Sequence, residues 1–251
     1  MSAFSKDKKP PFSQTGLDIP KRDKLQMQIG SRHRVSFSWE NAETIAEHVR
    51  TMDSLGEARR KQYSTLFVLA AASGLRCSEL LALRVNDVDF NAGTIRVEES
   101  SDQRSAGKIG ECKNVAAYRT VHLGDPEGQK AMETLKRFLD PAASPNALIF
   151  RSKRNGPLLE TTILSQGLYP ALKSLDLKQA GLHAFRRGCN RRWELAGIVP
   201  VVIRQQMGHT TAAMTSLYSG EIPIEQVKAE FSMKKRRGVV QLEKMENEAA
   251  A

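Results

Sequence analysis

The stretch LHAFRRGCNRRWELAGIVPVVIRQQMGHTTAAMTSLY, residues 182–218, decides the fold because it places two histidines, several arginines and a late tyrosine in helical sequence. Its periodicity predicts a helix over about residues 182–196. His183 and Arg186 are three residues apart on that helix, so both side chains project from one face. We expect one cleft to receive both side chains.

A second helix is predicted over the apolar run of residues 200–207, with a break at Gly208 and His209. The next helix is expected to open at a threonine cap directly afterwards. Tyr218 lies nine residues beyond His209, near the end of that third helix. The stretch therefore places three short helices in succession, with polar residues at their ends.

These residue types suit attack on a phosphodiester. Phosphoryl transfer needs a nucleophile, a group that accepts its proton, and cations that neutralise charge on the non-bridging oxygens. Tyr218, His183 and Arg186 supply one of each. A lone tyrosine near a helix end usually packs its ring and exposes its hydroxyl, so the hypothesis depends on the combination.

Upstream, the segment ASGLRCSELLAL, residues 72–83, predicts one helix that ends at Gly74 and another that opens at Arg76. Arg76 and Glu79 share an i, i+3 face, where they either hydrogen-bond to each other or point into a cleft. A buried charge needs such a partner. The leucines of this segment are expected in the core, namely Leu75, Leu80, Leu81 and Leu83.

Two β-type runs follow, residues 94–97 and 118–123, with a turn predicted at residues 91–93. Lys108 and Lys113 lie in the polar stretch between these runs. Further helices are predicted over residues 38–49, with Ser38 as the cap, and over residues 55–72, 126–139 and 160–174. The sequence therefore predicts a mainly α domain with a small antiparallel β-sheet, an α+β fold.

Four motifs occur in the order GLRCSELLALRVNDVD, HAFR, MGH and a tyrosine nine residues later. This set resembles the tyrosine recombinases, or phage integrases, over roughly residues 37–218. A lone HxxR pattern would arise by chance in many proteins, whereas four motifs at compatible spacings are specific. The resemblance implies the fold of the catalytic domain of that family.

The resemblance also implies a role for each matching residue. Tyr218 would attack the scissile phosphate and form a 3′-phosphotyrosyl link, releasing a 5′ hydroxyl. A free tyrosine has a pKa of about 10, so its hydroxyl needs a base, for which His183 is the candidate. His209 would donate to the phosphate. Arg76 and Arg186 would clamp the non-bridging oxygens, a task suited to a planar, permanently charged fork.

The family also has a lysine on a β-hairpin that protonates the leaving 5′ oxygen. Lys113 fits this position because its distance to Arg119 and the following strand matches the family pattern, and Lys108 is the rival. Glu79 would orient the cationic side chains, with a structural salt bridge as its alternative role. The implied catalytic set is Arg76, Lys113, His183, Arg186, His209 and Tyr218.

The composition favours a polyanionic partner, and we expect double-stranded DNA. The formal net charge is +10 and the isoelectric point is about 9.6, and cationic side chains release counterions when they bind phosphates. Candidate contacts to the DNA backbone are Arg187, Arg191, Arg192, Lys234, Lys235, Arg236 and Arg237. The alternative is that these charges form solvated faces.

Neither a cofactor nor a metal is expected. Three cysteines, Cys77, Cys112 and Cys189, form no CxxC pair and predict neither a disulfide framework nor a zinc site. No signal peptide opens the chain, and no apolar run reaches the roughly 20 residues that span a bilayer. We therefore expect a cytoplasmic, nucleoid-associated protein.

Three segments are predicted along the chain. Residues 1–35 are a flexible basic arm or a remnant interdomain linker, residues 36–220 the catalytic domain, and residues 221–251 a tail helix with a disordered end. The tail presents Ile222, Ile224, Val227 and Phe231, which either dock on a neighbouring protomer in a dimer or tetramer or pack on their own domain.

The leading hypothesis is a site-specific recombinase or integrase that breaks and rejoins DNA without a metal. Two alternatives stay open. A type IB topoisomerase shares the chemistry but relaxes supercoils without pairing two sites. A non-catalytic or partner-dependent DNA-binding remnant would explain why the chain has no room for the helical domain that usually precedes the catalytic domain.

Overall fold

The computed structural model describes residues 35–112, 117–208, 224–225 and 227–232. The chain divides into two units between Arg34 and Val35, and every described residue belongs to the second unit. Several predicted site residues lie outside the described residues, namely Lys113, His209, Tyr218, Lys234, Lys235, Arg236 and Arg237.

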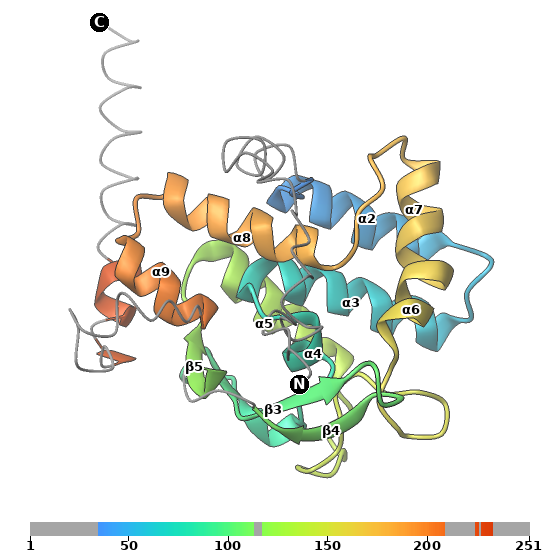
Figure 1. Ribbon diagram of the computed structural model, residues 1–251, viewed down its shortest axis with the longest axis horizontal. Helices are drawn as coiled ribbons and strands as arrows, with labels where there is room; N and C mark the ends of the chain where they lie inside the picture. The colour runs from blue at the N-terminus through green and yellow to red at the C-terminus, as the bar shows by residue number, and fades with distance from the viewer. Residues whose placement is uncertain (1–34, 113–116, 209–223, 226, 233–251) are drawn as a thin grey trace, which may run out of the picture. The chain divides into compact units, whose positions relative to one another are not determined.

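The described part is mostly helical, with two small antiparallel sheets (Figure 1). The α-helices are α2 (Trp39–Thr51), α3 (Glu57–Ser73), α4 (Cys77–Leu80), α5 (Pro126–Phe138), α6 (Glu160–Ile163), α7 (Tyr169–Ser174), α8 (His183–Leu195) and α9 (Pro200–Met207). A π-helical segment (Leu164–Leu168) joins α6 to α7, and a 3-10 turn (Val85–Asp87) follows α4. The strands are β1 (Val88–Asp89), β2 (Thr94–Val97), β3 (Glu99–Asp102), β4 (Lys108–Glu111) and β5 (Arg119–His122). The predicted α+β class is confirmed.

Helix α3 is the central element. Its residues are buried continuously from Gln62 to Ser73, because α2, α5 and α8 pack around it (Figure 1). The helix ends at Gly74, whose φ of 62° is left-handed, as expected for a helix stop. A Cβ at Gly74 would lie 2.7 Å from the Met207 methyl group. The left-handed φ, more than this contact with the end of a flexible side chain, favours glycine at this position.

Local sequence signals set the other helix ends. Ser38 and Asn41 form the capping box that opens α2, as predicted for Ser38. Gly208, with a φ of 63°, closes α9 at the predicted break. The four leucines expected in the core are each no more than 3% exposed. These predictions of helix ends and core positions are confirmed.

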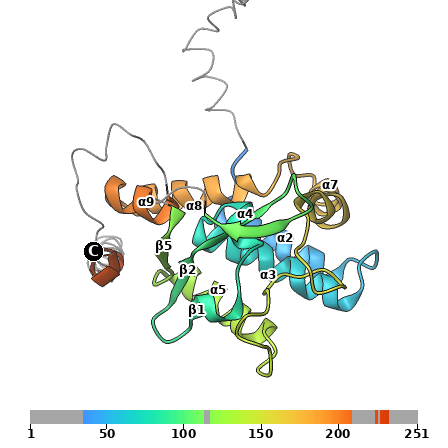
Figure 2. The same cartoon turned by 60° about the horizontal axis from the view of Figure 1, so that its bottom comes forward.

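Strands β1, β2 and β5 form one antiparallel sheet in the order β1-β2-β5, and β3 pairs with β4 in a second sheet. β2 and β5 match the two predicted runs, with Ile95 opposite Val121. β3 and β4 were missed, because ESSD and KIGE carry little apolar alternation. In Figure 2 the hairpin of β3 and β4 lies beside α4, and β5 lies beside α9.

A second, smaller apolar cluster joins α8 and α9 to the helical residues 224–225 and 227–232. Val227 is fully buried and Phe231 is 6% exposed. The Phe231 ring lies edge-on to Trp193 at 5.6 Å and to His122 at 5.7 Å between ring centroids. Ile224, Val227 and Phe231 therefore pack on their own domain, the second of the two predicted alternatives, while Ile222 lies outside the described residues.

In the described ranges, no helix is both long enough and apolar enough to span a bilayer. All three cysteines are free thiols.

Candidate active site

Arg186 is a buried guanidinium that joins the ends of two helices. It lies in the first turn of α8 and is 4% exposed. Its Nη1 donates to the Gly74 carbonyl at 2.6 Å, and its Nη2 donates to the Met207 carbonyl at 2.6 Å. Burial lowers the pKa of Arg186 to about 10, with the charge of Arg76 acting in the same direction. The side chain therefore remains a cation at neutral pH.

Arg76 reaches the same place from the start of α4. Its Nη1 donates to Glu79 Oε1 at 2.6 Å, its backbone N–H donates to Glu79 Oε2 at 2.8 Å, and its Nη2 donates to the Gly208 carbonyl. Its side chain is 37% exposed. The structure therefore brings Arg76 and Arg186 together at the end of α9, as predicted, and leaves Arg76 accessible from solvent.

Arg119 is a third arginine at this site. From the sequence it is named only as the residue from which the position of Lys113 is judged, and no role is predicted for it. Its Nη1 and Nη2 hold both oxygens of Glu79 at 3.1 and 2.8 Å. Its Nε donates to the Gln206 carbonyl at 2.8 Å. The side chains of Arg119 and Glu79 are both 2% exposed. A charged residue in the apolar strand sequence YRTVHL was the available signal, because a buried charge needs a partner.

Three guanidinium groups thus bind three consecutive carbonyls. Arg119 holds residue 206, Arg186 holds residue 207 and Arg76 holds residue 208. These carbonyls lie at the negative end of the α9 dipole, where cations are stabilised. His209 is the next residue in the chain. The arrangement fixes the backbone directly before it.

Glu79 is the acid that balances part of this charge. Burial alone would raise the pKa of Glu79, but hydrogen bonds and charge from Arg119 and then Arg76 outweigh it and hold the pKa at about 2. Glu79 is therefore an anion at neutral pH. Three cations and one anion leave the cluster of Arg76, Arg119, Arg186 and Glu79 with a net positive charge, which suits a phosphate ligand.

The side chain of Gln206 joins helix α9 to strand β5 next to the arginine cluster. This side chain is fully buried. Its Oε1 accepts from the His122 N–H at 2.7 Å, and its Nε2 donates to the Thr120 carbonyl at 3.2 Å. These two hydrogen bonds limit the movement of α9 along β5. The carbonyls of residues 206–208 therefore stay aligned with the three arginines.

The other predicted residues are placed as follows. His183 is the first residue of α8 and is exposed. Arg187 donates to the Val35 carbonyl at 2.7 Å, and Arg191 is exposed. Lys108, the alternative to Lys113, is exposed at the start of β4. The structure thus describes one of the two rival lysines, and it lies on a hairpin rather than in a loop.

Arg192 points into the protein. Its guanidinium donates to the carbonyls of Ala71 and Ala72, pairs with Asp125 at 2.9 Å and lies over the Trp39 ring at 5.6 Å. The charge run that suggested contact with DNA therefore includes a residue whose two terminal nitrogens donate inside the protein. We leave Arg192 out of the proposed contact surface.

The described residues contain no cluster of three or more His, Cys, Asp and Glu side chains that could hold a metal. The nearby thiols are poor nucleophiles at neutral pH, because burial raises the pKa of Cys189 to about 12 and also raises the pKa values of Cys77 and Cys112. The described residues of this site offer anion binding by arginines.

Comparison with known proteins identifies the family of the chain. A family model described as the phage integrase family matches residues 37–221. The protein y4gC of Sinorhizobium fredii (strain NBRC 101917 / NGR234), named as an integrase/recombinase, is 27% identical over 153 residues, which cover 60% of this chain and 71% of that protein. The tyrosine recombinase XerC of Mycobacterium sp. (strain KMS) is 27% identical over 153 residues, which cover 59% of this chain and 45% of XerC.

Among solved structures, the integrase of the Tn1549 transposon in complex with a circular intermediate DNA has a TM-score of 0.57 to this chain. It is 20% identical, and the match covers 80% of this chain and 66% of that chain. At this identity the likeness concerns the fold. The matched part spans less than half of XerC.

Proposed function

The chain belongs to the phage integrase family, and on that premise we propose that it is a site-specific DNA recombinase. In this proposal Tyr218 attacks a phosphodiester, a 3′-phosphotyrosyl bond forms, and the bond to the 5′ oxygen breaks. Attack by a 5′ hydroxyl on that link then rejoins the strand. The covalent link conserves the energy of the phosphodiester, so no nucleotide cofactor is needed.

The convergence of three arginines on the carbonyls of residues 206–208 carries this proposal. Arg76 is the most exposed of the three, so it is the one placed to bind a non-bridging oxygen directly. Arg186 lies against the same turn and adds positive charge behind it. Such preorganised cations stabilise the charge that develops on the phosphate without reorganisation during the reaction.

Glu79 and Arg119 act as positioning residues in this scheme. Glu79 accepts from the side chain and the backbone of Arg76, while Arg119 holds the same carboxylate from the other side. The direction of the Arg76 fork is therefore fixed before substrate arrives. This support is needed because an arginine side chain is otherwise free to adopt many rotamers.

The remaining roles stay as predicted from the sequence. His183 is the proposed base for Tyr218, His209 the proposed donor to the phosphate, and Lys113 the proposed acid for the leaving oxygen, with Lys108 as its rival. His183 opens the same helix that carries Arg186. We further propose double-stranded DNA as the partner, contacted in part by Arg191, and assembly into a dimer or tetramer on it.

The test is covalent trapping. The full chain and a Tyr218→Phe variant are incubated in EDTA with a pool of nicked duplexes of randomised sequence, from which a cleaved strand end diffuses away. A protein–DNA adduct on a denaturing gel, formed with Tyr218 and absent with Phe, is the expected result. Absence of any adduct with duplexes that the protein demonstrably binds would contradict the proposal and favour the non-catalytic alternative.

A supercoil-relaxation assay separates the topoisomerase alternative. The proposed recombinase should leave plasmid supercoiling unchanged while joining strands between two copies of the selected site. Relaxation of any plasmid, without exchange between sites, would identify a type IB topoisomerase instead.

A further inference from the structure

The opposite end of α3 from Gly74 opens on a cleft of about 1850 Å³. Helix α3 has 17 residues, and at 1.5 Å per residue its two ends lie about 25 Å apart. The cleft is therefore separate from the arginine cluster at Gly74. It is lined by the first turns of α3, the end of α5 and the segment around residues 147–155.

The cleft is strongly basic. Seven arginine and lysine residues line it, against two acidic residues, Glu57 and Asp140. Glu57 is paired with Lys61 at 2.6 Å, and Asp140 Oδ1 accepts from the Ala142 N–H at 2.9 Å. Both carboxylates thus already have partners. Within the described part of the chain, by contrast, Arg59, Arg151 and Lys153 form no ion pair.

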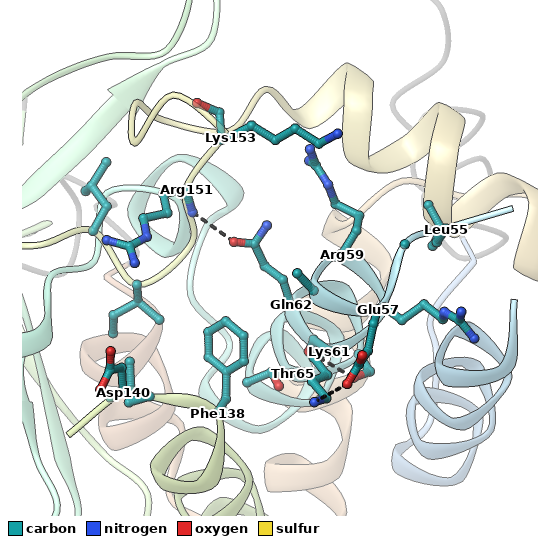
Figure 3. Close-up of a pocket in the computed structure, with 18 of the residues that line it drawn as sticks. Leu55, Glu57, Arg59, Lys61, Gln62, Thr65, Phe138, Asp140, Arg151 and Lys153 are labelled. Carbon is teal, nitrogen blue, oxygen red and sulfur yellow. Dashed lines mark hydrogen bonds and ion pairs between the residues drawn. The ribbon is translucent and has the colours of Figure 1, made fainter. Parts of the chain in front are cut away.

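Figure 3 shows how these groups lie around the opening, with the Arg151 side chain directed away from the other two. The side chains of Arg59 and Lys153 extend toward one another across the opening, and Arg151 lies on the far wall. Arg59 is held in place, since its Nη1 donates to the Tyr63 hydroxyl at 3.1 Å and its guanidinium lies over the Tyr63 ring at 5.4 Å. Like charges brought together in this way repel unless an anion lies between them.

Gln62 adds an amide donor at the base of the cleft. It is 7% exposed. Its Oε1 accepts from the Arg151 N–H at 3.0 Å, which leaves Nε2 pointing into the opening (Figure 3). Nε2 has no acceptor among the described residues. An amide N–H that faces the opening can donate to an oxygen of a bound anion.

The position on α3 adds an independent argument. Arg59 and two further basic residues occupy the first turns of a helix, where the dipole is positive and cations are unfavourable. Glu57 is the acidic residue in this turn, and a negative charge is the one that the helix dipole favours there. Local rules are broken in this way mainly where function requires it, and the N-terminus of a helix is a favourable place for a phosphate.

We propose that this cleft binds a phosphate-bearing anion through Arg59, Gln62, Arg151 and Lys153. The guanidinium groups supply planar pairs of donors that match phosphate oxygens, and Lys153 adds a mobile point charge. Because the arginine cluster lies about 25 Å away along α3, the anion is not the phosphate that would be cleaved. The proposal does not depend on DNA cleavage by Tyr218.

The test is calorimetric titration of the full chain with inorganic pyrophosphate at fixed ionic strength. The double variant Arg151→Gln with Lys153→Gln removes two exposed cations and should weaken binding at least tenfold. Gln62→Glu keeps the acceptor for the Arg151 N–H but replaces the inward donor with a carboxylate, so it should abolish binding while the protein stays folded. Thermal unfolding checks that both variants are folded.

A matched control has the same loss of charge elsewhere. Lys136→Gln with Lys178→Gln changes two exposed lysines outside the cleft and should bind pyrophosphate as the unmodified chain does. An Arg76→Gln variant removes binding at the other end of α3 and should retain the cleft site. Equal weakening in the cleft and control variants, or unchanged binding in the cleft variants, would overturn the proposal.

Competition in the Arg76→Gln background then identifies the source of the phosphate. Displacement of pyrophosphate by a 20-base-pair duplex indicates the backbone of a DNA segment, whereas displacement by ATP and not by the duplex indicates a free phosphate compound. Failure of both competitors to displace pyrophosphate would overturn the assignment of the site to a DNA backbone or to a nucleoside phosphate.

Discussion

The two ends of helix α3 place arginine side chains in opposite circumstances. At the C-terminal end, Arg186 and Arg119 are buried and every contact described above is with a carbonyl or a carboxylate. At the N-terminal end, Arg59 and Arg60 face a cleft at the positive pole of the helix. The comparison teaches that a guanidinium in an ion pair or bound to carbonyls fixes the local geometry, whereas one without an ion pair can bind a ligand.

Removing a paired arginine should have the largest effect. Arg119→Met would leave Glu79 buried without its bidentate partner and the carbonyl of Gln206 without its donor. Loss of one partner from a buried pair costs about 3–5 kcal/mol. We expect a decrease of that size in the free energy of unfolding, measured by urea denaturation.

The double variant Arg119→Met with Glu79→Gln is the control, because it also removes the stranded charge. It should be less destabilised than the sum of the two single variants. A loss below about 1 kcal/mol in Arg119→Met would mean that this pair behaves as a surface salt bridge, and the contrast between the two ends of α3 would fail.

Acid should weaken the same end selectively. The pKa of Glu79 falls from its ordinary value of 4.5 to about 2 in the folded chain. A depressed pKa contributes stability that is present above pH 4.5 and is lost as the pH falls toward 2. At about 1.4 kcal/mol per pKa unit, the contribution is about 3 kcal/mol.

Unfolding free energies measured between pH 5 and pH 2 test this value. The Glu79→Gln variant, which cannot titrate at this position, should show a shallower decline than the unmodified chain. Parallel curves for the two proteins would show that other carboxylates cause the acid sensitivity.

Arg76→Lys should separate catalysis from stability at the paired end. A lysine cannot hold Glu79 and the Gly208 carbonyl with two arms of a planar fork. Under the proposed function we expect the rate of adduct formation to fall about a hundredfold, equivalent to about 2.7 kcal/mol. Stopped-time denaturing gels measure this rate, with Arg191→Gln on the exposed part of α8 as a charge control.

Arg191→Gln should change the adduct rate much less than Arg76→Lys does. If Arg76→Lys retains a rate within threefold of the unmodified chain, the arginine is not used as a fork, and its role would be structural.

The sequence predicted what depends on neighbours along the chain. The Arg76–Glu79 pair follows from i, i+3 spacing, and the helix ends follow from Ser38, Gly74 and Gly208. Arg119 could not be found this way, since its partner Glu79 is 40 residues away and no periodicity records a contact between a strand and a helix. The polar hairpin of β3 and β4 was missed for a related reason, because turn geometry and cross-strand bonds rather than apolar alternation hold it together.

The basic cleft also depends on long-range contacts that the sequence does not reveal. The charges of Arg59 and Arg60 are visible in the sequence, but a charge run on a helix is usually a solvated face. What distinguishes this run is the loop that places Arg151 and Lys153 opposite it, about 90 residues further on, and Gln62 bridging to that loop. Long-range packing turns an ordinary charge run into a candidate ligand site.

The smallest effect is expected at Arg60, and it should have the opposite sign. Its Nε is buried and makes no hydrogen bond within the described residues, and its charge lies at the positive end of the α3 dipole. Arg60→Gln removes an unsatisfied donor and an unfavourable charge, while glutamine has a similar helix propensity. We expect the free energy of unfolding to rise by about 0.5–1 kcal/mol at low ionic strength.

Thermal and urea unfolding at low and high salt measure this gain, which should shrink as salt screens the dipole. A destabilised Arg60→Gln variant would show that Arg60 is paired in the way that Arg119 is, and the two ends of α3 would then follow one rule. A stabilised variant shows instead that the chain keeps a cation at this end of α3 at a cost to its own stability, where Arg60 adds to the positive charge that lines the cleft.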